Sequence, residues 1–222
     1  YCNLETEQTK YFREEFSFEE IKKWFDDLME EYGKWATFQC EMKNQRQASI
    51  KELDFPFEYR PGQKKLVSDV YRTIMRQKLL FMQAPTGVGK TISTIFPAVK
   101  AVGEELADRI FYLTAKTITA TVAKETFALL EKNGYRAKTI QITAKEKLCP
   151  CDEMECNPVT CPYAKGHFDR VNDAVFDLLH RCEMIERDDI LSQADRYTVC
   201  PFELCLDTAS WCDNIICDYN YV

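Results

Sequence analysis

The sequence is poor in glycine and histidine and has no long apolar run. It contains seven glycines and two histidines in 222 residues. No apolar stretch approaches the roughly 18 residues that a membrane-spanning helix needs, and the N-terminal segment YCNLETEQTKYFREE lacks the basic start and apolar core of a signal peptide. We therefore expect a cytoplasmic protein with no membrane partner. Because the chain begins with Tyr1 and not with Met, we also expect it to be part of a longer protein.

Positive charge is scarce as well. The chain carries 29 lysines and arginines against 36 aspartates and glutamates, which gives a formal net charge of −7. This balance excludes a uniformly basic nucleic-acid-binding protein, although it leaves room for a groove with local positive charge. Hydrophobic residues at 45% and aromatic residues at 13% exclude a disordered chain. The composition therefore predicts a globular protein with one large domain, or one and a half.

The first 52 residues are expected to form a helical lead-in. Ser17 and Glu20 make a capping box, in which the serine hydroxyl accepts a hydrogen bond from a free backbone N–H at the helix start. Apolar side chains then recur every three or four residues from Ile21 to Trp35, which predicts an amphipathic helix. We interpret this stripe as a face that packs on the rest of the protein, in preference to a partner-binding face.

Short apolar runs alternate with helical patterns in the middle of the chain. The runs predict strands buried on both faces of a sheet: LLFMQA (79–84), RIFYLTA (109–115) and AKTIQITA (137–144). Helical patterns lie before and between them, so the alternation predicts an α/β fold with a parallel sheet. The rhythm stops after Ala144, and strand character returns only at WCDNIICDYNYV (211–222).

The segment APTGVGKT (84–91) matches the phosphate-loop pattern. Its glycines let backbone N–H groups turn toward phosphate oxygens at the start of a helix, where the helix dipole also favours anions. Lys90 is placed to reach the β- and γ-phosphates of ATP, and the Thr91 hydroxyl to bind Mg²⁺. The predicted nucleotide-binding residues in this loop are Ala84, Pro85, Thr86, Gly87, Val88, Gly89, Lys90 and Thr91.

A nucleotide hydrolase also needs an acidic residue at the end of another strand, to hold Mg²⁺ and orient water. The strands that end at Thr114 and Thr143 present hydroxyl groups instead. We therefore expect the chain to end, within Asp218–Val222, before that carboxylate, and the 222 residues alone to be inactive.

Eleven cysteines are about twice the usual number, and most of them lie after residue 148. Clustered cysteines in a cytosolic chain indicate a metal or an iron–sulfur cluster. The C-x2-C pairs of zinc ribbons are absent, and neither His167 nor His180 has a ligand partner at helical spacing. The irregular spacing favours a cubane iron–sulfur cluster over zinc, without excluding zinc. Buried core thiols are the alternative for Cys2, Cys40, Cys212 and Cys217.

Together, the phosphate loop and the cysteine insertion resemble the XPD/DinG-like superfamily 2 DNA helicases. The resemblance covers residues 53–222. FPFEYRPGQ (55–63) is similar to the family's nucleotide-recognition segment, with Arg60 and Gln63 at its polar positions, and YLTAKTITATVAKE (112–125) is similar to a motif that touches single-stranded DNA. KEKLC, CNPVTCPYAKGHFDR and CPFEL resemble the four-cysteine pattern of its [4Fe–4S] domain, and DYNYV resembles the segment leading toward the DEAH-type motif.

The resemblance implies a P-loop NTPase with a RecA-like parallel sheet and an inserted iron–sulfur domain. It divides the chain into a lead-in (1–52), the first part of helicase domain 1 (53–144), the cluster insertion (145–205) and the return to domain 1 (206–222). The implied cofactors are ATP, Mg²⁺ and a [4Fe–4S] cluster. The implied cluster ligands are Cys149, Cys156, Cys161 and Cys200, with Cys151 as a rival for the first position.

The implied activity is ATP-dependent 5′ to 3′ unwinding of DNA in repair or recombination, with single-stranded and fork DNA as partners. Thr114, Lys116 and Thr117 are DNA-contact candidates because they follow a strand at the carboxyl edge of the sheet, where ligands bind. Arg170, with Lys165 and His167, either touches DNA phosphates or forms a solvated charged turn. The alternative functions are a nucleotide-gated nucleic-acid-binding protein that does not unwind, with a zinc or cluster module, and a structural module stabilised by its cysteines.

Overall fold

The computed structural model describes residues 2–85 and 87–222, and it has an α/β architecture. The chain forms two compact units, residues 1–43 and residues 44–222. Among the described residues, no helix combines the length and the apolar character needed to cross a lipid bilayer.

Helix α1 (Phe18–Glu52) begins in the first unit, and its last nine residues belong to the second. The capping box is confirmed, because the Ser17 N–H donates to Glu20 Oε2 at 2.7 Å and the Glu20 N–H donates to Ser17 Oγ at 3.2 Å. The aromatic stripe is exposed, with Trp24 at 62% and Tyr32 at 64%. Its packing against the rest of the protein stays a prediction.

A four-stranded parallel sheet forms the centre of the second unit, which confirms the predicted sheet type. Its strands are β1 (Ile110–Leu113), β2 (Thr139–Gln141), β3 (Met184–Ile185) and β4 (Asn214–Cys217), in the order β1-β4-β2-β3. The register pairs Ile110 with Asn214 and Thr139 with Asn214. Strand β4 is therefore central, and all four of its residues are buried.

Helices α2 (Gln63–Met75), α3 (Lys90–Gly103) and α4 (Thr117–Lys132) form at the three places where the sequence predicts helices. Helices α3 and α4 share a core with the end of α1 on one face of the sheet, and α2 packs on α3. Ile216 of β4 joins their core, while Ile215, which points to the opposite face as alternate strand residues do, is also buried. Buried members of this core include Ile50, Leu53, Ile95, Phe96, Phe127 and Leu130.

The predicted strand at 79–84 is wrong. In the structure this segment has no regular secondary structure, and Leu79 and Phe81 are 87% and 93% exposed. A strand needs a neighbour that satisfies its backbone N–H and C=O groups, and none of the four described strands pairs with this segment. An apolar run of six residues therefore does not suffice to form a strand.

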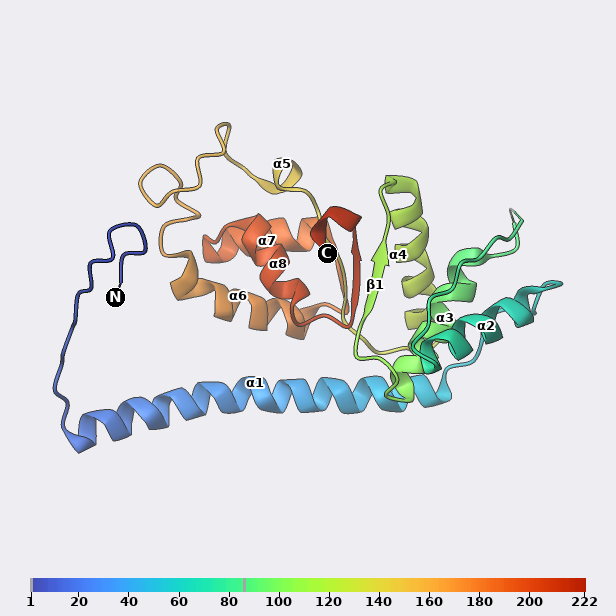
Figure 1. The fold of residues 1–222 in the computed structure, drawn as a ribbon, viewed down its shortest axis with the longest axis horizontal. Helices are drawn as coiled ribbons and strands as arrows, with labels where there is room; N and C mark the ends of the chain where they lie inside the picture. The colour runs from blue at the N-terminus through green and yellow to red at the C-terminus, as the bar shows by residue number, and fades with distance from the viewer. Residues whose placement is uncertain (1, 86) are drawn as a thin grey trace. The chain divides into compact units, whose positions relative to one another are not determined.

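Between β2 and β4 the chain builds a mostly helical insertion. Its helices are α5 (Lys145–Leu148), α6 (His167–Arg181), α7 (Arg187–Tyr197) and α8 (Pro201–Ala209). Figure 1 shows α6, α7 and α8 grouped together, preceded by a long irregular loop. Val171, Val175, Leu178 and Leu179 of α6 are buried, so this face of the helix packs inside the insertion. Strand β3 lies inside the insertion and pairs with β2, so the insertion also extends the sheet.

A buried ion pair joins α1 to the start of β4. The Arg46 guanidinium donates from Nη1 to Asp213 Oδ1, and Asp213 Oδ2 accepts the Lys138 N–H at 2.9 Å. Burial raises the pKa of Asp213, although the Arg46 charge acts in the opposite direction. These contacts join three segments, namely the end of α1, the residue before β2 and the residue before β4, at the point where the chain passes from the insertion into β4.

Candidate functional site

The phosphate loop leads directly into α3, as its sequence predicts. Gly87 and Gly89 have φ angles of 83° and 78°, in the left-handed region that favours glycine. A Cβ atom on Gly89 would lie 2.7 Å from Gln63 Nε2, so this position has no room for a side chain. Gly89 caps α3 without a side-chain hydrogen bond, which leaves N–H groups at the helix N-terminus for an anion. Thr86 lies outside the described residues.

Lys90 folds back over its own loop. Its ammonium group donates to the backbone oxygens of Ala84 at 3.1 Å and Pro85 at 3.0 Å. A bound phosphate would exchange these two neutral acceptors for charged oxygens, which attract the ammonium group more strongly. Thr91 is half-buried in the first turn of α3, next to Lys90.

The structure brings the segment before α2 against the phosphate loop. The Arg60 guanidinium donates from Nη1 to the Gly87 carbonyl, and the Arg60 N–H donates to Gln63 Oε1 at 3.0 Å. Gln63 is 3% exposed and lies against Gly89. Arg60 and Gln63, which are 27 and 26 residues from their loop partners in the sequence, therefore meet the loop in space.

A cavity of about 370 Å³ lies beside this contact. The start of α2 forms one wall and the segment between Leu80 and Val88 forms the other. Its volume is within the range of small-molecule sites. Its polar lining residues include Lys65, Asp69 and Gln83.

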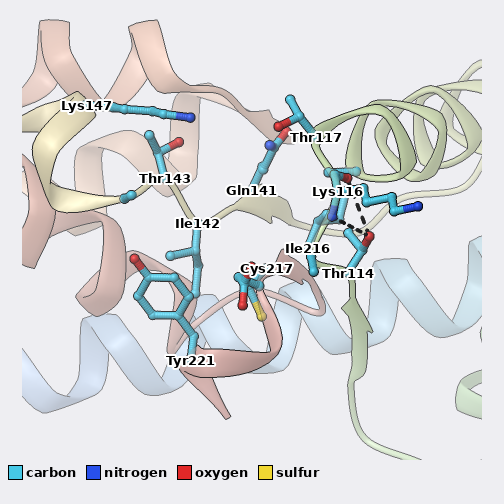
Figure 2. Close-up of a pocket in the computed structure, with 14 residues that line it drawn as sticks. Thr114, Lys116, Thr117, Gln141, Ile142, Thr143, Lys147, Ile216, Cys217 and Tyr221 are labelled. Atoms are coloured by element: carbon cyan, nitrogen blue, oxygen red, sulfur yellow. Dashed lines mark hydrogen bonds between the residues drawn. The ribbon is translucent and has the colours of Figure 1, made fainter.

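A second cavity, of about 180 Å³, lies at the carboxyl edge of the parallel sheet. Three predicted DNA-contact residues, Thr114, Lys116 and Thr117, line it together. Figure 2 shows Lys116 and Lys147 on opposite sides of the pocket. Sequence reasoning missed Gln141, Lys147 and Tyr221 in this lining. Only Lys147, three residues after the predicted strand at 137–144, carried a signal that could have found it, because Gln141 and Tyr221 lie inside predicted strand segments.

The hydroxyl of Thr114 is already engaged at the turn into α4. It accepts the Lys116 N–H at 3.2 Å and is hydrogen-bonded to the Thr119 hydroxyl. These bonds, drawn in part in Figure 2, shape the start of α4 and position Lys116 at the rim of the pocket. Asp218 also lines the pocket, and its Oδ1 accepts the Asn220 N–H at 3.0 Å to cap the short 3-10 helix η1 (Tyr219–Tyr221).

The four predicted cluster ligands and Cys151 lie on the loops around α5, α6 and α8 of the insertion. Cys149 ends α5, and its N–H donates to Lys145 O at 2.8 Å. The Sγ atoms of Cys151 and Cys161 are 4.0 Å apart. Desolvation and, secondarily, the neighbouring thiols of Cys161 and Cys149 raise the pKa of the Cys151 thiol to about 11. Cys200 caps the N-terminus of α8.

Lys145 connects Cys156 with Cys200. A hydrogen bond that the Lys145 ammonium group donates to the Cys156 sulfur is the main cause that raises the pKa of Lys145, and the charge of Cys200 adds to it. The ammonium group also lies 5.9 Å from the centre of the Phe202 ring, just after Cys200. A cation in this place favours thiolates, which are the form of cysteine that binds metals.

The donor set fits an iron–sulfur cluster in its chemistry. Soft thiolates are the ligands that such clusters require, and the four predicted ligands and Cys151 all belong to the insertion. In the described residues, however, no group of three or more cysteine, histidine or acidic side chains is gathered closely enough to hold a metal ion. A cluster would therefore have to draw the sulfur atoms together.

Arg170 lies within the insertion and not in the pocket at the sheet edge. Its guanidinium donates to the backbone oxygens of Lys165, Tyr197 and Thr198 at 2.6–2.9 Å. Its predicted contact with DNA therefore competes with three contacts inside the protein.

The chain was also compared with known proteins. No protein-family model matches it, and no curated protein matches it.

Proposed function

We propose that this chain is the first motor segment of an ATP-dependent DNA helicase with a [4Fe–4S] domain, on a RecA-like sheet. One observation carries the proposal: a glycine-rich phosphate loop and a cysteine-bearing insertion belong to the same compact unit, and the insertion lies between neighbouring strands of one parallel sheet. A phosphate loop alone supports any nucleotide-binding protein, and clustered cysteines alone support any thiolate-bound metal.

ATP is the expected ligand of the phosphate loop. Lys90 and the free N–H groups at the start of α3 would hold the phosphates, and Thr91 would contribute a hydroxyl to Mg²⁺. The contacts of Arg60 with Gly87 and of Gln63 with Gly89 support a role for both residues in shaping the loop. We expect slow hydrolysis by these residues alone, because the strand-end carboxylate of Asp218 caps η1 and an arginine finger contributes about 10³–10⁵ in rate in related enzymes.

Single-stranded DNA is the expected partner of the carboxyl edge of the sheet. Lys116 and Lys147 would neutralise phosphates there, and threonine hydroxyls and Gln141 offer polar contacts to the backbone. Ligands bind at this edge in open parallel sheets. The cluster, when bound, would supply a rigid covalent framework for the insertion, whose long loop has little regular structure between Cys149 and Gly166.

The test is to purify the 222-residue chain without oxygen and to measure three quantities on one preparation. These are iron and acid-labile sulfide per chain, binding of a fluorescent ATP analogue, and binding of a single-stranded oligonucleotide. Four irons with four sulfides and saturable binding of both ligands would support the proposal. A colourless zinc protein that binds both ligands would favour the alternative, a nucleic-acid-binding protein that does not unwind. Loss of nucleotide binding would overturn both.

A further inference from the structure

The first turn of α6 connects the two halves of the predicted ligand set. Cys161 lies six residues before α6, whereas Cys200 follows 39 residues later at the start of α8. Nothing in the sequence between them dictates that the two should meet. Two side chains of the α6 first turn, His167 and Arg170, make hydrogen bonds to the segment that carries Cys200.

His167 binds the backbone of Cys200 directly. The imidazole is 4% exposed, and its Nδ1 atom accepts the Cys200 N–H at 3.2 Å. Because Nδ1 is the acceptor, the ring hydrogen of the neutral imidazole is on Nε2. Nε2 lies 3.7 Å from Asp207 Oδ2 on α8, which is longer than a hydrogen bond. Both ring nitrogens therefore face α8, the helix that Cys200 caps.

Arg170 holds the turn that precedes Cys200. Its Nε atom donates to Tyr197 O at 2.9 Å, and Nη2 donates to Thr198 O at 2.6 Å and to Lys165 O at 2.7 Å. Thr198 has φ of 54°, a left-handed conformation that is unfavourable for a non-glycine residue. The hydrogen bond from Arg170 to its carbonyl helps to keep this strained turn in place.

The geometry of the preceding turn agrees with this arrangement. Gly166 has φ of 67°, and a Cβ atom there would lie 2.6 Å from Arg170 Nη1. A larger residue at this position would displace the guanidinium from its carbonyl partners. The turn between Cys161 and α6 is therefore shaped to admit Arg170.

We propose that His167 and Arg170 are positioning residues that hold Cys200 in place relative to Cys161, so that the fourth ligand is preset before a cluster binds. The inference rests on the proposed function only in taking the ligand set to be a cluster site. Its physical basis is preorganisation: a ligand that the protein already holds near its final place loses less conformational freedom when the cluster forms. Partners of this kind typically change metal affinity by about 10- to 100-fold.

Two substitutions at His167 separate the hydrogen bond from simple packing. His167→Leu fills a similar volume but cannot accept from the Cys200 N–H. His167→Asn retains an acceptor at the place of Nδ1. Arg170→Met removes the three donors while keeping an unbranched stem. Arg196→Met is the matched control, because Arg196 lies in the same insertion and pairs with Asp177 at the surface.

The experiment measures the rate at which an iron chelator bleaches the cluster absorbance of each loaded variant, with binding of the fluorescent ATP analogue as the check on folding. We expect His167→Leu and Arg170→Met to lose iron about 10- to 100-fold faster than the unsubstituted protein. His167→Asn and Arg196→Met should stay close to its rate. All four should bind the ATP analogue normally.

Each other outcome overturns the inference. Equal rates for His167→Leu and the unsubstituted protein would show that the imidazole does not preset Cys200. If His167→Asn lost iron as fast as His167→Leu, the effect would come from packing of the imidazole ring and not from its hydrogen bond. If a variant lost ATP binding together with iron, the effect would come from general unfolding. If the unsubstituted protein binds no iron, the proposed function itself fails, and the inference fails with it.

Discussion

At the scale of single residues, the side chains with predicted chemical roles are held by their own backbone surroundings. Lys90 contacts two loop carbonyls, Thr114 accepts the Lys116 N–H at the turn into α4, and Asp218 caps η1. Each of these groups would have to exchange an internal partner for a ligand.

We predict that Lys90→Ala abolishes detectable ATP binding and leaves the iron content unchanged. The ammonium group is the only full positive charge that the phosphate-loop sequence offers to the phosphates, whereas the cluster ligands lie in a separate insertion. Equilibrium titration with a fluorescent ATP analogue and iron analysis check both parts. Lys132→Ala, at the end of α4, is the control. Unaltered ATP binding in Lys90→Ala would remove the phosphate-loop assignment.

The first cluster ligand can be decided by a pair of serine variants. We predict that Cys149→Ser loses iron and that Cys151→Ser retains it, because Cys149 is anchored at the end of α5 and the serine oxygen is a poorer iron ligand than thiolate. The 4.0 Å approach of Cys151 to Cys161 makes the test necessary. Iron and sulfide analysis of both variants gives the answer. Retention in Cys149→Ser with loss in Cys151→Ser would reverse the assignment.

At the scale of secondary-structure elements, the second unit depends on contacts that link distant segments. The end of α1 packs with α3 and α4, and Arg46 of α1 pairs with Asp213 before β4. The segment 79–84, in contrast, has an apolar sequence but no partner in the described structure. One prediction concerns each case.

Removal of Arg46 should leave an uncompensated buried carboxylate. We predict that Arg46→Met costs about 3–5 kcal/mol of unfolding free energy near pH 7. Burial already raises the Asp213 pKa in the folded protein, and loss of Arg46 raises it further. A carboxyl group whose pKa is higher when folded loses stability as pH rises through that pKa, so the cost should shrink in acid. Urea denaturation at several pH values measures this, with exposed Arg76→Met as control. A cost that grows in acid would contradict it.

We predict that serine substitution of Phe81, in the exposed segment 79–84, affects stability much less than serine substitution of Phe127 in the core. Phe81→Ser should leave the melting temperature nearly unchanged and reduce aggregation, because Phe81 is 93% exposed beside an unpaired backbone. Phe127→Ser should cost several kcal/mol, because Phe127 is 1% exposed in the core. Thermal melting and light scattering compare the two. A large loss of stability in Phe81→Ser would place residues 79–84 in a sheet after all.

At the scale of the whole molecule, the net charge of −7 constrains any binding to DNA. General electrostatic attraction is unfavourable, so affinity would come from local cations such as Lys116 and Lys147 at the sheet edge. A site of this kind neutralises few phosphates and contacts few bases.

We predict that the chain prefers single-stranded to double-stranded DNA, with little sequence preference. With about three or four phosphates neutralised, the logarithm of the affinity should fall with the logarithm of salt concentration with a slope of roughly −2 to −3. Fluorescence anisotropy with single- and double-stranded oligonucleotides at several salt concentrations measures both. Equal affinity for duplex, or no salt dependence, would remove the DNA-motor proposal.

The sequence by itself determined helices α2, α3 and α4 and the parallel sheet type, because apolar spacing and the alternation of short apolar runs with helical patterns can be recognised along the chain. Apolar spacing indicated α2, α3 and α4, and the glycines of the loop allow the left-handed turn at Gly87 and Gly89. Strand formation at 79–84 could not be decided locally, since a strand depends on a neighbour that the sequence pattern does not name.

Only the tertiary structure decided which distant residues meet. It placed Gln63 against Gly89, brought Lys147 to the same pocket as Lys116, and directed Arg170 to three carbonyls of its own insertion. It also showed β3 as a strand that the insertion adds to the sheet. These contacts depend on side-chain packing and backbone pairing between segments tens of residues apart, and such interactions leave no periodic signal in the sequence.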